Sequence, residues 1–139
     1  MTYRQELEEI ATAWVHRGWR ERELDIVTDL HAENFTDHSA GTRAGDNEGF
    51  RNRMRALFTA FPDFSAGIEK LVIDETSSEV VVQWSASGTC QASYGGFSPN
   101  GQPVLFTGID ILRVEQGRIT DRWGEWNWAE ILHQLHGIP

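Results

Sequence analysis

Two carboxylates stand inside strand-like sequence near the end of the chain. Asp110 lies in residues 104–115 and Glu125 in residues 118–126, and both segments are rich in branched and aromatic residues. A strand that faces a core rarely carries an unpaired charge, because burying one is costly. These two acids therefore either face water or line a pocket, where a desolvated carboxyl group suits acid/base chemistry.

The turn between the two segments determines how the acids lie. If residues 116–117 form a two-residue turn, residue 110 pairs with 123 and residue 108 with 125. Asp110, Asp121, Trp123 and Glu125 then share one face. Two carboxyl groups that close can share a proton, which suits general acid/base catalysis near neutral pH. Gly124 offers a different outcome, because a bulge there would turn Glu125 to the other face.

Other ionisable residues have both a catalytic and a structural interpretation. His38 follows Asp37, and the pair could orient one imidazole tautomer for catalysis, or His38 could simply bond to local backbone. Asp110 could form an ion pair with Arg122 or another arginine at the sheet edge. For Asp121, near the turn, we expect an exposed ion pair.

Six tryptophans in 139 residues provide material for an apolar binding site. As a group they could form flat walls for a ring-shaped ligand, or they could be core residues. Phe58 would close the helical side of such a pocket. Asp37 is also expected to line the pocket. The tryptophans expected to border the interior are Trp14, Trp84, Trp123 and Trp126.

The composition argues against several classes of partner and of protein. The formal charge of −9 argues against nucleic acid and anionic membranes as partners, and no apolar run is long enough to span a bilayer. We expect the basic residues Arg51, Arg53 and Arg55 to lie on a solvated helix face. The single Cys90 fits a reducing cytoplasm, and 139 residues suit one domain spanning 1–139.

Metal binding is not expected. His133 and His136 have helical i, i+3 spacing but no nearby acid as a third ligand. The sequence therefore predicts neither a metal nor a cofactor.

Hydrophobic periodicity predicts helices first and strands afterwards, which indicates an α+β fold with helices on one face of a curved, mixed or antiparallel sheet. Asp46 is the expected cap of the third helix and Asn127 that of the last. The predicted helices cover residues 3–18, 20–31, 46–61 and 127–136, and the predicted strands residues 66–74, 79–89, 104–115 and 118–126.

The order of these pieces resembles the SnoaL-like polyketide cyclase family of the NTF2-like superfamily. The resemblance implies an α+β cone around a deep, largely apolar pocket for a small hydrophobic molecule, and a homodimer formed through the outer sheet face. It also implies cofactor-independent ring closure with an aspartate as acid/base. The matching pieces include Phe35-Thr-Asp-His-Ser39, Phe61-Pro-Asp-Phe64, Val82-Gln-Trp-Ser-Ala-Ser-Gly-Thr89, Gly108-Ile-Asp-Ile-Leu-Arg113 and Gly117-Arg-Ile-Thr-Asp-Arg-Trp123.

The chain departs from the family at the catalytic position. The family's aspartate falls on Gly124 and the histidine of the preceding strand on Asp110. Two hypotheses follow: a cyclase- or isomerase-type enzyme that uses Asp110 with Glu125 or His38, or a non-catalytic binding or interaction module. Acids that are ion-paired or exposed would favour the module.

Overall fold

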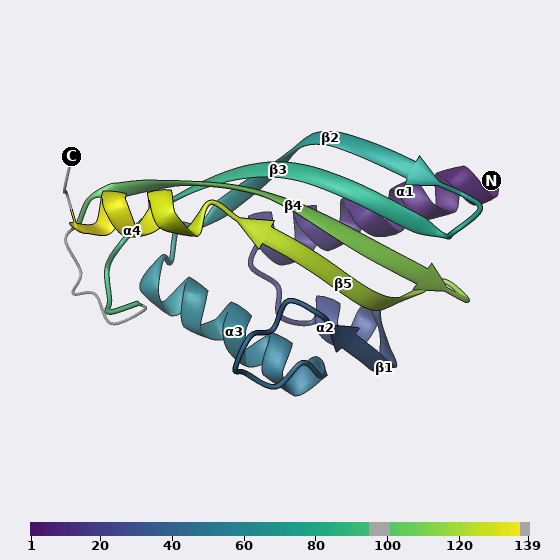
Figure 1. Cartoon of the computed structure of the whole chain (residues 1–139), viewed down its shortest axis with the longest axis horizontal. Helices are drawn as coiled ribbons and strands as arrows, with labels where there is room; N and C mark the ends of the chain where they lie inside the picture. The colour runs from purple at the N-terminus through teal and green to yellow at the C-terminus, as the bar shows by residue number, and fades with distance from the viewer. Residues whose placement is uncertain (95–100, 137–139) are drawn as a thin grey trace.

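The chain folds as helices packed against one strongly curved sheet. The computed structural model of the protein describes residues 1–94 and 101–136 (Figure 1). Its strands lie in the order β1-β5-β4-β3-β2, with β1 parallel to β5 and the other neighbours antiparallel. The strands are β1 (His31–Asp37), β2 (Ser65–Asp74), β3 (Glu79–Thr89), β4 (Pro103–Glu115) and β5 (Arg118–Trp126).

The α+β prediction is confirmed, and the four predicted strands match β2 to β5 within a residue at each end. Strand prediction succeeds here because apolar and polar residues alternate with a period of two. The glycine, proline and asparagine residues of segment 93–102 predict a loop between β3 and β4, and most of that segment, residues 95–100, lies outside the described residues.

Capping side chains mark the start of two helices. Thr2 and Gln5 form a reciprocal capping box at the start of the first helix. Asp46 Oδ1 accepts a hydrogen bond of 2.9 Å from Gly49 N and so caps α3, as predicted. Asn127, the predicted cap of the last helix, instead bonds to β4, where its Oδ1 accepts a hydrogen bond of 2.9 Å from Thr107 N. The helical elements are α1 (Tyr3–Ala13), the π-helical segment η1 (Trp14–Arg20), α2 (Ile26–Asp29), α3 (Asn47–Ala60) and α4 (Trp128–His136).

The helix predicted over residues 20–31 is wrong for most of its length. After η1 ends at Arg20, only Ile26–Asp29 is helical, and Arg22 has a left-handed φ of 59°, which interrupts any helix. From His31 the chain joins the sheet, and Ile119 N donates a 2.8 Å hydrogen bond to Leu30 O. Pairing with β5 thus overrides local helix propensity.

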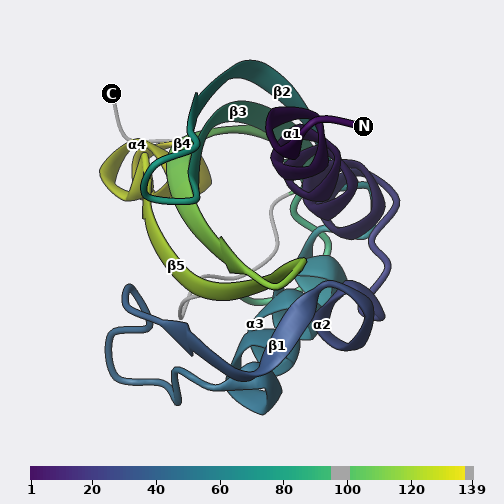
Figure 2. The same cartoon turned by 90° about the vertical axis from the view of Figure 1, so that its right-hand side faces the viewer.

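Curvature of the sheet creates the interior of the molecule. Seen end-on, β2 to β5 form an arc whose concave side faces α1 and α3 (Figure 2). Buried aromatic and aliphatic side chains from the helices and from this concave face form one continuous core. Inward-facing side chains of β4 and β5 therefore meet side chains of α3 and η1.

The β4–β5 hairpin has a bulge that the sequence did not reveal. Val114 pairs with Ile119, but Arg113 pairs with Asp121, so Thr120 is the extra residue. The predicted register is therefore wrong by one residue beyond the bulge. Asp110 lies opposite Gly124, rather than Trp123 as predicted.

A neutral histidine is built into the core beside this sheet. His31 is 2% exposed; its Nε2 accepts from Trp14 Nε1 at 3.0 Å, and its Nδ1 lies 3.0 Å from Asn47 Oδ1. Since an indole N–H can only donate, Nε2 must be the unprotonated nitrogen, and Nδ1–H donates to Asn47. Burial lowers the pKa of His31 from 6.5 to about 4.

Stability should therefore fall as acid is added. In the unfolded chain His31 becomes protonated below about pH 6.5. In the folded chain it stays neutral until the pH falls to about 4, which is its pKa in the folded state. The difference corresponds to a loss of roughly 3 kcal/mol between about pH 7 and pH 4. Urea unfolding of the wild type and of His31→Gln, whose amide oxygen can accept from Trp14, measures it. His31→Gln should lose less stability over that range; parallel losses would contradict the assignment.

Candidate active site

A buried arginine on β5 joins two buried carboxylates. Arg122 Nε donates to Asp110 Oδ1 at 2.6 Å, and Arg122 Nη1 lies 3.1 and 3.2 Å from the two oxygens of Asp37. Each of the three residues is at most 3% exposed. Arg43, from the segment that follows β1, also pairs with Asp37. The result is a four-residue ionic chain, Asp110–Arg122–Asp37–Arg43, that runs from β4 through β5 to the end of β1.

The ion pairs shift the pKa values of Asp37 and Arg122. Burial alone would raise the pKa of Asp37, but the charge of Arg122 and the hydrogen bonds from Arg43 and Ser39 N outweigh it and hold that pKa below its usual range. Burial would likewise lower the pKa of Arg122, and the carboxylates of Asp110 and Asp37 raise it instead. Asp37 and Arg122 are therefore both charged at neutral pH, and charge-assisted hydrogen bonds orient them.

Two glycines make room for these contacts. Gly124 lies opposite Asp110, and a Cβ there would collide with the Arg122 guanidinium and the Asp110 carboxylate. Gly108 lies opposite Trp84, whose indole occupies the space that a side chain at residue 108 would need. Trp84 Nε1 thereby reaches Asp110 Oδ2 at 2.6 Å. Both oxygens of Asp110 thus have a donor.

The Asp110 carboxylate borders a small internal cavity of about 10 Å³. Of the described residues that line it, Asp110 is the only one with an ionisable side chain. A cavity of this volume holds about one water molecule, so a larger ligand must displace side chains of the wall. The lining residues are Trp14, Val15, Trp19, Phe64, Ala66, Trp84, Asp110 and Trp126.

Other aromatic and charged residues predicted for the pocket lie elsewhere. Phe58 packs behind the wall, with its ring centroid 5.8 Å from those of Trp19 and Phe64. Asp37 lies in the ionic chain, beyond Arg122 as seen from the cavity. Trp123 pairs with Ile111 on the outer face of the sheet and does not line the cavity.

His38 lies on the outer face and does not form a dyad with Asp37. Its ring stacks on Trp123, with centroids 4.5 Å apart and planes inclined by 7°, and its Nε2 lies 2.8 Å from Asp121 Oδ1. Neighbouring residues 37 and 38 point to opposite sides of the strand, as the period of two requires. Glu125 pairs with Ile109 and is exposed on the same outer face. The structure therefore separates Asp110 from both of its predicted catalytic partners.

Sequence reasoning missed Arg53, which lies on α3. We expected it on a solvated face with Arg51 and Arg55, yet its guanidinium lies 4.4 Å from the ring centroid of Trp126 in the interior. The signal was available: Arg53 is three residues after Phe50 and four before Leu57, on the apolar side of the helix.

The described residues form neither a cluster of metal ligands nor a membrane-spanning helix. Within 1–94 and 101–136, no three His, Cys, Asp or Glu side chains gather as metal ligands. Every helix in these ranges is too short or too polar to span a bilayer.

The helices packed on an open, strongly curved mixed sheet, with one aromatic interior, define an NTF2-like α+β fold. Residues 9–135 match the SnoaL-like polyketide cyclase family, and the chain belongs to that family. A comparison with curated protein sequences found no match.

Solved structures agree with the fold. IdmH from Streptomyces antibioticus, a proposed polyketide cyclase, is 26% identical with a TM-score of 0.78, over 95% of this chain and 99% of its own. AclR from Streptomyces galilaeus, a proposed hydroxylase, is 19% identical with a TM-score of 0.86, over 98% and 99%. A SnoaL-like polyketide cyclase from Agrobacterium tumefaciens is 21% identical with a TM-score of 0.75, over 93% and 97%. The differing names show that this fold alone does not determine a reaction.

The space at Gly124 can be tested by filling it. Gly124→Ala should destabilise the protein by about 1–3 kcal/mol, because the new methyl group overlaps the buried Arg122–Asp110 pair. Gly67→Ala on β2 is the matched control, since a Cβ there meets only the Arg20 guanidinium at 3.5 Å. Urea unfolding gives both values. Equal stability of the two variants would show that the pair does not need the space.

Proposed function

We propose that this chain is a cofactor-independent enzyme of the cyclase or isomerase type, in which Asp110 acts on a hydrophobic, carbonyl-bearing ring compound. The observation that carries the proposal is the Asp110 carboxylate, the ionisable group on the wall of the aromatic cavity. It lies at the strand position where the resemblance places a functional side chain. The tryptophans of the wall supply flat apolar surfaces suited to a ring compound.

In the proposed step, an Asp110 oxygen removes a proton from the carbon next to the substrate carbonyl. The electrons of the broken C–H bond move to the carbonyl oxygen and form an enolate. The enolate carbon then attacks a second carbonyl, whose oxygen takes the proton from Asp110, or a conjugated enolate takes that proton back from Asp110 at another carbon. Arg122 and Trp84 hold the carboxylate in place with hydrogen bonds of 2.6 Å each. Arg122 also pairs with Asp37, so its positive charge is divided between the two carboxylates. Exclusion of water strengthens such a base.

A second function, ligand binding without catalysis, is supported by three placements. Asp110 is ion-paired with Arg122, Glu125 is exposed on the outer face, and Gly124 stands where the family's catalytic aspartate falls. This is the arrangement that the sequence analysis associated with a binding module. The experiment that tests the enzyme also separates it from this second function.

Exchange of carbon-bound protons in D₂O tests the proposed reaction class without the natural substrate. The probe is 2-tetralone, a bicyclic ketone, and the readout is loss of its α-proton signals by NMR. The wild type should accelerate exchange, and Asp110→Asn should slow that reaction by roughly 10²–10⁴-fold. Glu125→Gln is the control, since residue 125 lies on the outer face.

Undiminished exchange by Asp110→Asn would exclude Asp110 as the base. Saturable binding of 2-tetralone without any acceleration over buffer would favour the binding function instead.

Dimerisation through the outer sheet face remains a prediction from the resemblance. Val72, Leu105 and Ile109 are large apolar side chains that are 50%, 63% and 48% exposed, and such a dimer could cover them.

A further inference from the structure

Three buried donors of the interior lack acceptors. Trp19 Nε1, Arg53 Nη1 and Trp126 Nε1 are enclosed, and none of them has a hydrogen-bond partner among the described residues. Buried polar groups are nearly always paired, since each unpaired one costs free energy. One such atom is an ordinary exception. Three, all of them N–H groups, need an explanation.

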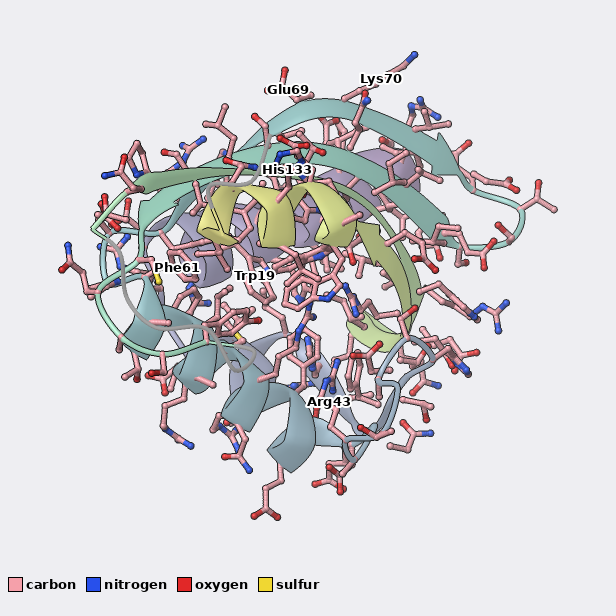
Figure 3. The ribbon with its side chains drawn as sticks, turned by 60° about the vertical axis from the view of Figure 1, so that its left-hand side comes forward. Trp19, Arg43, Phe61, Glu69, Lys70 and His133 are labelled. Carbon is pink, nitrogen blue, oxygen red and sulfur yellow. The ribbon has the colours of Figure 1, made fainter. Side chains whose placement is uncertain are left out.

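The three side chains contact one another although they come from η1, α3 and β5. The Arg53 guanidinium carbon lies 4.4 Å from the ring centroid of Trp126 and 5.9 Å from that of Trp19. The two indole centroids are 6.0 Å apart. Figure 3 shows Trp19 pointing into the interior, whereas Glu69 and Lys70 project from the outer side of β2. The unpaired donors thus form one cluster, and both indoles line the cavity that Asp110 borders.

The charges of the interior also do not balance. Asp37 and Asp110 face the guanidinium groups of Arg43 and Arg122, which leaves Arg53 as a third positive charge. Among the described residues, no carboxylate lies within ion-pair distance of Arg53. Stacking on Trp126 relieves part of the cost of burying that charge but supplies no acceptor. Burial, and next to it the charge of Arg122, lowers the pKa of Arg53 to about 10, so the group is still a cation at neutral pH.

We propose that Arg53, Trp19 and Trp126 form a binding site for an anionic oxygen of a planar ligand, such as a carboxylate, phenolate or enolate. A negative oxygen would satisfy the donors and balance the third positive charge, while the ligand ring would lie against the indoles. The site uses the same interior as the proposed function, on which the inference rests for the ligand's location. It deepens that function by naming an anionic or enolisable substrate class. Binding at this site needs no turnover.

Paired small probes test the site. Benzoate and benzamide have nearly the same shape but differ in charge, and ligands of this size bind in the millimolar range. Calorimetric titration of the wild type should give an affinity for benzoate at least about tenfold higher than for benzamide, as expected for charge-assisted hydrogen bonds. Arg53→Gln should reduce the preference to about twofold or less and leave the benzamide affinity unchanged.

Arg55→Gln is the matched control. It lies on the same helix, removes the same charge from the protein, and its side chain is exposed and bonded to Asn52. It should keep the full preference for benzoate. Arg53→Lys, which retains the charge, should keep part of the preference and also serves if Arg53→Gln does not fold.

Indole N–H signals in ¹H–¹⁵N spectra provide a second readout. Benzoate should move the Nε1–H resonances of Trp19 and Trp126 downfield, as new hydrogen bonds form. That of Trp84, already bonded to Asp110, should stay in place. Assignments come from Trp19→Phe and Trp126→Phe.

Equal affinities for the two probes, equal losses in Arg53→Gln and Arg55→Gln, or no saturable binding of benzoate would each overturn the site. Asp110→Asn separates this inference from the proposed enzyme. If Asp110→Asn keeps the benzoate preference while the 2-tetralone test fails, the site stands and the catalytic proposal falls. If the 2-tetralone test gives the expected result but the wild type shows no preference for benzoate, the catalytic proposal stands and the anion site falls.

Discussion

The Arg122 guanidinium, buried between Asp110 and Asp37, is the constraint on which the rest of the interior depends. A buried ion pair is stable only when its geometry is good and its remaining polar atoms are satisfied. Here residues from four strands together meet these requirements. β5 supplies Arg122, β4 and β3 supply Asp110 and its Trp84 partner, and the end of β1 supplies Asp37. The parallel strands β1 and β5 are therefore also joined by the buried Asp37–Arg122 ion pair.

This constraint explains why residue 124 is glycine. Any side chain there would enter the space taken by Arg122 and Asp110. The chain thus has the SnoaL-like scaffold, with a buried carboxylate on β4 beside an arginine, and with glycine at the position where the family's aspartate falls. Among the described residues, most of the remaining interior is apolar and aromatic, with the neutral His31 and the donors around Arg53 as polar exceptions. The Asp110 carboxylate and the indoles of Trp19 and Trp126 border one cavity, and Arg53 contacts both indoles. Under the two proposals, a ligand in this cavity would meet Asp110 as the base and N–H donors for a developing oxyanion, a combination that favours proton transfer next to a carbonyl.

The sequence predicted the scaffold better than the site. Strand alternation, the Asp46 cap and the order of elements were readable because they follow from local chemistry. The bulge was not, because Thr120 is an ordinary strand residue and the extra residue appears only in the pairing. That single residue changed the partner of Asp110. The spacing of Arg53 to Phe50 and Leu57 indicates its inward position. We instead grouped Arg53 with the neighbouring basic residues and expected it to face solvent. The unpaired indole N–H groups result from tertiary packing, which no sequence pattern indicates.

The most direct test of this account is a double-mutant cycle between Arg122 and Asp110, measured by urea unfolding. Arg122→Met in the wild type should cost about 3–5 kcal/mol, because it leaves the buried Asp110 charge uncompensated. In the Asp110→Asn background the same substitution should cost less than half as much, since Asp37 retains Arg43 as its partner. Equal costs in the two backgrounds would contradict the claim that this buried pair organises the interior.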